Sequence, residues 1–396
     1  MKSLRAVATA LLLVVCLSGA AAPSERAPLL ALLAPTTGKQ AAIGQRVVAL
    51  VAMALEGRPV RVQVFDTGPS ASAAAQQAVD AGASLVLGPV GALETAEVAG
   101  ALAPSRLSMV SLSGVDGLED APRRLRGRVS RGDELRSICR RLADRPPVRV
   151  ALLVPDGPEG DEAAAQFTRC MTASDRPLAQ LLRLGPLPRD AGRAVEALAQ
   201  GGGRLASPGR SGAAWPEPPK TGRTRAPSAG RPEVLVAVAT AAQGSALLPA
   251  LGIRGWFDGE QPLRIYGTGE WEGPELATAA AFLSNLSVVE RCAWSDPRDV
   301  SRAFADRFEA RFGEPPTRFD AEVFDAVMQV EAGRATLPSG VASPERWAEA
   351  ILRAEGTEGV CGDLSWSKTG AIDRPLPLWS VDGDGALYPR AAAWDD

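Results

Sequence analysis

Residues 29–55 read LLALLAPTTGKQAAIGQRVVALVAMAL. Six apolar residues come first, and the turn-forming segment 35–38 ends them. From residue 40 onward, apolar residues recur at helical spacing through Ile43, Val47 and Leu50. The stretch therefore predicts a buried strand, a polar loop and a helix, in that order.

The same order repeats along the chain. Strands are predicted at residues 60–65, 84–87, 108–112, 148–154, 178–184, 234–239 and 263–266. Helices are predicted at residues 70–81, 93–102, 133–142, 162–171, 193–198, 245–251, 300–312, 321–331 and 344–353. Strands joined by such helices pair in parallel through right-handed crossovers, and ligands meet the loops at their carboxyl ends.

Two domains are expected. An arginine-rich stretch at residues 123–131 separates two series of this alternation, and 396 residues exceed one ordinary core. The predicted fold class is α/β, with parallel sheets. Within the helix at 300–312, Phe304, Phe308 and Phe312 share one face, which predicts a buried aromatic stripe.

The composition excludes several functions. The chain has no histidine, so it lacks His-dependent triads and His metal ligands. It has no GxSxG motif, and its net charge of -3 includes no basic stripe for nucleic acid. The acids that could pair for hydrolytic chemistry are equally well explained as surface and turn residues: Asp66, Glu94, Asp156, Glu159, Asp161 and Glu270. We therefore predict no catalytic activity, cofactor, metal or nucleic-acid partner.

The first 22 residues are typical of a signal peptide. Lys2 and Arg5 precede the apolar run 6–17, and the small residues 19–22 suit cleavage. Cys16 raises the alternative of lipid attachment, but Val15 stands where such a site takes a small residue. We expect secretion to the periplasm rather than a lipoprotein.

Cleavage leaves four cysteines, Cys139, Cys170, Cys292 and Cys361. An even number in an oxidising compartment suggests two disulfides, for which three connectivities exist. Residues 201–232 are dense in Gly, Pro, Ser and Arg, which predicts a disordered surface insertion. Its basic residues leave a docking role open.

Several motifs, in this order, resemble the leucine/isoleucine/valine-binding family of type I periplasmic binding proteins. Residues 32–38 with Gly44 are similar to its first strand and helix, 85–89 to its third strand and 109–114 to its fourth. Residues 362–366 and 369–370 are similar to a glycine-containing β segment late in the chains of that family. A closer resemblance to penicillin-binding-protein activators, which share the fold, comes from residues 187–190, 266–271 and 311–316.

The resemblance implies two Rossmann-like lobes with parallel sheets around a hinge cleft. Lobe 1 would take residues 27–131 plus about 293–345, and lobe 2 residues 132–292 plus about 346–390, including the insertion 201–232. On this arrangement Cys139–Cys170 would join neighbouring helices of lobe 2. Cys292–Cys361 would lie near two crossings between the lobes and would tether the hinge.

The resemblance also implies a binding site. Donors for a ligand carboxylate fall near Ala92, Ser113, Gly114 and Val115, and Glu270 takes the place of the acid that pairs a ligand amino group. Ile43 and Glu159 stand where the family has aromatic walls. The full set of candidate cleft residues is Thr37, Ile43, Ala92, Ser111, Ser113, Gly114, Glu159, Thr268, Glu270 and Trp271.

Two functions follow as expectations. The first is a non-catalytic solute receptor for an amino acid or similar small molecule, which feeds a membrane transporter of the ABC type. The second is an activator of a penicillin-binding peptidoglycan synthase that uses the same fold for protein–protein contact.

Overall fold

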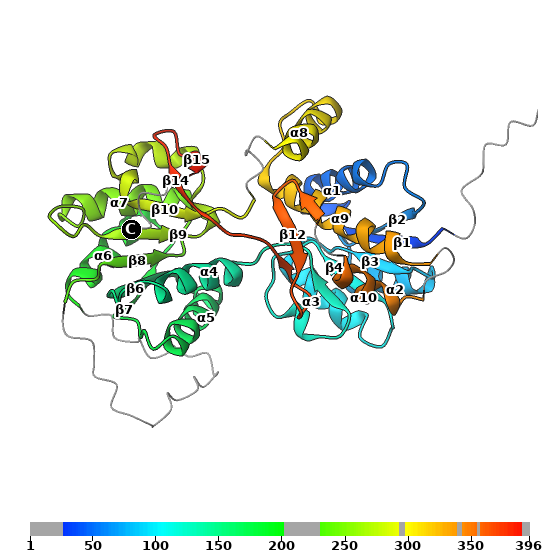
Figure 1. Cartoon of the computed structure of the whole chain (residues 1–396), viewed down its shortest axis with the longest axis horizontal. Helices are drawn as coiled ribbons and strands as arrows, with labels where there is room; N and C mark the ends of the chain where they lie inside the picture. Colours follow the sequence, from blue (N-terminus) through cyan, green and yellow to red (C-terminus); the bar gives the residue numbers. More distant parts are fainter. Residues whose placement is uncertain (1–26, 202–229, 293–297, 339–342, 355–356, 390–396) are drawn as a thin grey trace, which may run out of the picture.

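The computed structural model describes residues 27–201, 230–292, 298–338, 343–354 and 357–389. The predicted signal peptide, with Cys16, lies outside these residues, as does the predicted insertion except for residues 201 and 230–232. The described residues form two α/β lobes joined by extended crossings (Figure 1). The predicted fold class is thereby confirmed.

The first lobe contains a five-stranded parallel sheet of order β2-β1-β3-β4-β5. Its strands are β1 (Leu29–Ala34), β2 (Arg61–Asp66), β3 (Leu85–Leu87), β4 (Ser108–Ser111) and β5 (Arg124–Arg126). Within β1, Leu30 and Leu32 pack into one core, and Ala31 and Leu33 into another. Burial on both faces explains why this strand is an unbroken apolar run in the sequence.

Helices cover both faces of this sheet. The core that contains Leu30 and Leu32 is covered by α1 (Ala41–Ala54), α8 (Asp299–Phe312), α9 (Arg318–Thr336) and α10 (Arg346–Arg353). The opposite face is covered by α2 (Ala71–Asp80) and α3 (Ala92–Ala101). Gly44 allows α1 to lie close to the loop after β1, because a Cβ there would stand 2.0 Å from the carbonyl oxygen of Pro35.

The second lobe contains a seven-stranded sheet of order β15-β14-β10-β9-β8-β6-β7. Five strands run in parallel: β6 (Val150–Pro155), β7 (Gln180–Leu184), β8 (Val234–Ala237), β9 (Arg264–Gly267) and β10 (Leu286–Val289). The antiparallel strands β14 (Leu378–Val381) and β15 (Leu387–Pro389) extend its edge. The parallel strands are therefore wound in the same order as those of the first lobe.

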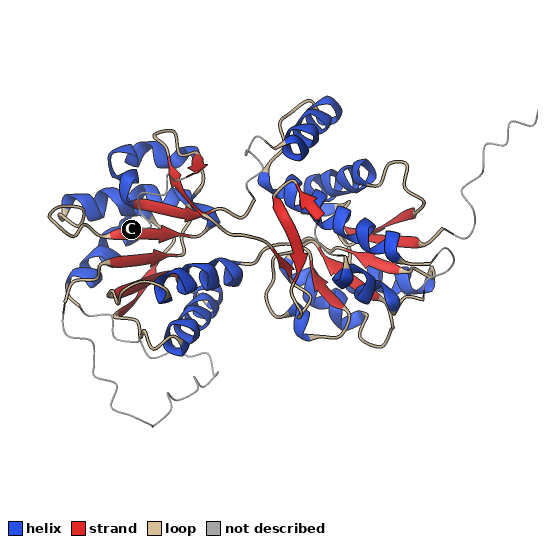
Figure 2. Ribbon diagram, in the orientation of Figure 1, coloured by secondary structure: helices blue, strands red, loops and turns tan. Residues whose placement is uncertain are grey.

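Two further cores flank this second sheet. One packs under α4 (Arg131–Ala143) and α5 (Pro158–Ala173). The other packs under α6 (Pro188–Ala199), α7 (Ala241–Ile253) and the 3-10 helices η3 (Gly269–Trp271) and η4 (Pro274–Asn285). Both sheets thus lie between helical layers, as Figure 2 shows.

The expected boundary near residue 345 is wrong. Trp347 and Ile351 of α10 are fully buried in the core of the first lobe. The strands β11 (Thr357–Gly359), β12 (Gly362–Trp366) and β13 (Ile372–Asp373) also lie there, and Ala371 forms a β-bridge with Arg126. The apolar stripe of α10 completes the layer on α9. The chain therefore returns to the second lobe only between β13 and β14.

Both disulfides expected from the resemblance are present. Cys139–Cys170 joins α4 to α5 within the second lobe. Cys292 follows β10, and its bond to Cys361 reaches the turn between β11 and β12. The chain passes from the second lobe back to the first directly after β10, and we call this segment the second crossing. Since Cys292 and Cys361 both lie in the first-lobe core, their bond fixes the end of this crossing to the first lobe.

The aromatic stripe on α8 is buried as predicted at Phe304 and Phe308, with exposed fractions of 3% and 0%. We expect Phe308→Ala to lower the free energy of unfolding by about 3–5 kcal/mol, through lost burial and the cavity left behind. Phe312→Ala, at the half-buried end of the stripe, serves as the matched control and should cost less. Urea denaturation measures both, and equal losses would contradict this packing.

Candidate functional site

A pocket of about 380 Å³ lies between the two lobes. Its first wall comes from the segments that follow β3, β4 and β5, and its second wall from those that follow β6, β9 and β10. Each segment leaves the carboxyl end of a parallel strand, so two sheets wound in the same order direct their loops to one place. The described residues that line this pocket include no aromatic side chain.

The first-lobe wall offers hydrogen-bond donors. Helix α3 begins there at Ala92, and its N-cap Gly91 has no side chain to cap the first-turn amides, although the Glu94 carboxylate of the same turn lies beside Gly91. Ser113 Oγ accepts from the Val115 amide at 3.2 Å, which leaves the hydroxyl proton for an acceptor. Together with Gly114, these groups can receive an anion at the positive end of the helix.

The second-lobe wall is polar and charged. Glu159, Glu162 and Gln166 come from the first turns of α5, directly after β6. Glu270 comes from η3 after β9, and Arg291 follows β10.

A buried ion-pair network supports this wall. Arg291 donates through Nε and Nη2 to the two carboxylate oxygens of Glu134, each at 2.7 Å. Glu134 Oε1 also accepts from the Gly269 amide at 2.7 Å. The fully buried Glu134 thus ties the end of β10 to the loop after β9. Such a charge is tolerated in the interior because it is paired and hydrogen-bonded.

Glu270 is itself paired with two arginines. Its Oε1 lies 3.1 Å from Arg131 Nη2 and 3.5 Å from Arg291 Nη2, and its Oε2 accepts from Thr268 Oγ1 at 2.9 Å. Burial opposes ionisation, but the charges of Arg291 and Arg131 outweigh it and lower the pKa of Glu270. Arg131 lies at the end of the first crossing between the lobes, which joins β5 to α4. It also contacts Glu159 at 3.3 Å.

Half of the ten predicted cleft residues line the pocket. They are Ala92, Ser113, Gly114, Glu159 and Glu270. Two more contact these lining residues. Ser111 Oγ accepts a hydrogen bond from the Ser113 amide at 3.1 Å, and Thr268 Oγ1 donates one to Glu270.

Three predicted residues are not among those lining the pocket. Thr37 donates through Oγ1 to Asp66 Oδ2 at 2.5 Å, so it joins the loops after β1 and β2. Ile43 is 40% exposed on α1. Trp271 is fully buried in the second-lobe core, where its indole N–H donates to the Ala237 carbonyl at 3.0 Å. A large indole with a satisfied N–H is stable in that position.

The arginines of the pocket were not predicted as site residues. Arg128 and Arg131 belong to the arginine-rich stretch at the first crossing, and Arg291 follows β10 immediately before Cys292. Asp116, Glu162 and Gln166 complete the polar lining. Their position along the chain was the available signal, because each arginine stands two to five residues beyond the end of a buried strand.

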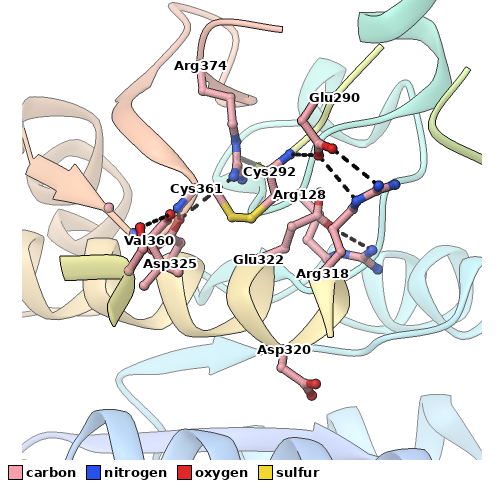
Figure 3. Close-up of a disulfide and its surroundings, with 12 residues drawn as sticks. Arg128, Glu290, Cys292, Arg318, Asp320, Glu322, Asp325, Val360, Cys361 and Arg374 are labelled. Carbon is pink, nitrogen blue, oxygen red and sulfur yellow. Dashed lines mark hydrogen bonds and ion pairs between the residues drawn. A yellow bond between two sulfur atoms is a disulfide. The ribbon is translucent and has the colours of Figure 1, made fainter. Parts of the chain in front are cut away.

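The second crossing carries a cluster of buried charges around the Cys292–Cys361 disulfide (Figure 3). Glu290 accepts from the Cys292 amide at 2.6 Å, and Asp325 accepts from the Cys361 amide at 2.9 Å. Arg318 Nε lies 3.3 Å from Glu290, and the buried Arg374 lies 3.8 Å from Asp325. Each half of the disulfide is therefore held by a carboxylate at the hinge.

Among the residues that the structure describes, no helix has both the length and the apolar character to cross a bilayer. Among the same residues, no group of three or more His, Cys, Asp or Glu side chains is placed to hold a metal ion.

Comparisons with known proteins agree with this geometry. Residues 30–386 match the family described as periplasmic binding protein. A crystal structure of a putative branched-chain amino acid ABC transporter from Rhodospirillum rubrum is similar, with a TM-score of 0.72 and 17% identity over 92% of this chain and 100% of that chain. No curated protein matches.

Two other solved structures show the same likeness. A leucine binding protein from Thermotoga maritima has a TM-score of 0.63 and 15% identity, over 92% of this chain and 98% of that chain. A solute binding protein from R. palustris in complex with benzoate has a TM-score of 0.62 and 15% identity, over 91% of this chain and 95% of that chain.

The hinge carboxylates predict a pH dependence of stability. Burial raises the pKa of Glu290 to about 7 and that of Asp325 to about 6, although Arg318 and Arg374 oppose the shifts. The folded protein therefore holds these protons more tightly than the unfolded chain. The stability they contribute is fully present below their ordinary pKa values and is lost as the pH rises through about 6 and 7.

We expect Glu290→Gln to remove part of this loss while keeping an oxygen that accepts from the Cys292 amide. Between about pH 5 and pH 8, the free energy of unfolding should fall by about 2 kcal/mol less in the variant than in the unsubstituted protein. Urea denaturation at both pH values measures the difference. Glu309→Gln, on the exposed face of α8, is the control. Parallel pH profiles for Glu290→Gln and the unsubstituted protein would contradict the assignment.

Proposed function

Because this chain belongs to the family of periplasmic binding proteins, we propose that it is an exported, non-catalytic receptor that binds a small solute between its lobes and delivers it to a membrane transporter. The observation that carries the proposal is the pocket itself. It lies where the loops of two similarly wound sheets meet, and it combines helix-end amides, a hydroxyl and paired charges.

The size and lining of the pocket support a ligand as small as an amino acid. A volume of about 380 Å³ suits a compact molecule, and the apolar residues that line the pocket are small, such as Val90, Val115 and Ala163. A carboxylate on the ligand would find donors at Ala92, Ser113 and Gly114. Solved proteins of this fold include one in complex with isoleucine and one in complex with benzoate.

Membership of the family supports a location outside the cytoplasmic membrane. We propose the periplasm, reached by a cleaved signal at residues 1–22 rather than by lipid attachment at Cys16. The disulfides Cys139–Cys170 and Cys292–Cys361 suit an oxidising compartment. The alternative role, as an activator of a penicillin-binding peptidoglycan synthase, receives no support from the comparisons.

Filling the pocket tests the receptor role. A ligand at about 100 times its Kd stabilises its receptor by about 2.7 kcal/mol, so amino acids, small organic acids and other small solutes can be screened by the rise in Tm. We expect Ala92→Trp to abolish the rise by occupying the pocket, because Ala92 is exposed where α3 begins.

Ala96→Trp, exposed one turn further along α3, is the matched control and should keep the full rise. Both variants should have the Tm of the unsubstituted protein before ligand is added. A broad screen without any rise in Tm, or a rise that survives Ala92→Trp, would contradict the proposed function.

A further inference from the structure

The charge pairing around Glu270 restricts the chemistry of the ligand. Both of its carboxylate oxygens have partners in the protein, Arg131 and Arg291 at Oε1 and Thr268 at Oε2. Arg291 cannot turn away easily, because two of its nitrogens bind the buried Glu134 at 2.7 Å. Glu270 is therefore an acid whose charge is already matched.

The third arginine of the lining is matched in the same way. Arg128 Nη2 lies 2.6 Å from the buried Glu322, and its guanidinium also lies over the Phe319 ring at 4.9 Å. Arg131 has a second contact with the exposed Glu159. Each arginine that lines the pocket thus has a carboxylate partner within the protein.

An ammonium group meets an unfavourable arrangement here. To bind Glu270 it would have to share the carboxylate with Arg131 and Arg291, and it would then stand next to two guanidinium groups of the same sign. A hydroxyl group avoids both costs. It donates to a carboxylate and accepts from a guanidinium at once, so it can bind beside the ion pair without breaking it.

The rest of the pocket also favours hydroxyl groups. Asp116, Glu162 and Gln166 present polar atoms to the space, and no aromatic side chain is among the described lining residues. A large apolar ligand would exclude water from these polar groups and offer them no hydrogen bond in return, which is costly. A carboxylate is still accommodated at Ala92, Ser113 and Gly114, where the start of α3 favours negative charge.

On the premise that the chain is a solute receptor, we propose that the Arg131–Glu270–Arg291 arrangement makes its pocket select small hydroxylated carboxylic acids over amino acids of the same skeleton. Arg131 is the residue that determines this specificity. Its guanidinium neutralises the carboxylate with which an ammonium group would otherwise pair.

Matched pairs of probes test the proposal on the full mature protein, after bound ligand is removed by unfolding and refolding. The pairs are lactate and alanine, glycerate and serine, and malate and aspartate, compared by thermal shift and by titration calorimetry. In at least one pair, the hydroxy acid should bind at least about tenfold more tightly than the amino acid.

Arg131→Gln should reverse or abolish this preference, because Glu270 then keeps only the more distant Arg291 as a cationic partner and an ammonium group can take the place of Arg131. Arg131→Lys retains the positive charge and should keep the preference. This variant therefore distinguishes an effect of the charge at position 131 from an effect of side-chain packing. Arg346→Gln is the matched control: Arg346 opens α10 as Arg131 opens α4, and it is exposed. The control should behave as the unsubstituted protein does.

The outcomes separate this proposal from the receptor role. Tighter binding of the amino acid in every pair that binds overturns the selectivity and leaves the receptor role intact. Unchanged preference in Arg131→Gln overturns the role of Arg131. If none of the six probes binds, the selectivity is overturned, and the receptor role falls only if the broad solute screen is also blank.

Discussion

Parallel strand pairing is the constraint on which the rest of this structure depends. Each parallel pair needs a crossover, the crossovers cover both faces with helices, and central strands such as β1, β3, β6 and β8 are then apolar on both sides. The remaining polar positions are forced into the loops at the strand ends. Since β2-β1-β3-β4-β5 and β7-β6-β8-β9-β10 are wound alike, those loops converge on one polar pocket.

Electrostatics gives that pocket its character. Buried charged side chains, such as Glu134, Glu322 and Arg291, are tolerated because each has an oppositely charged partner at hydrogen-bond distance. The result is a wall whose side chains are held in place before a ligand arrives, which reduces the entropy cost of binding. Buried carboxylates also fix the backbone at the hinge, where Glu290 and Asp325 accept hydrogen bonds from the amides of the two disulfide-bonded cysteines.

Much of the fold could be predicted from the sequence, because apolar runs and helical spacing report burial directly. The pocket was harder. Ala92, Ser113 and Gly114 follow from their place after strands, whereas the Arg291–Glu134 pair joins residues 157 positions apart and leaves no local pattern. Trp271 was misplaced because its loop resembles a site although its ring fills the core. The apolar residues on one face of α10 predicted that this helix is buried, but they did not indicate which lobe it packs against.

The interleaved path of the chain has a consequence for biogenesis. The face of the first sheet that carries Leu30 and Leu32 is covered in part by Trp347 and Ile351, which are synthesised after most of the second lobe. The second sheet, in turn, gains β14 and β15 only from the last segment. Neither half therefore completes its interior as the chain emerges, and contacts of such long sequence separation form slowly. The nascent polypeptide can therefore complete neither lobe until nearly its whole length exists.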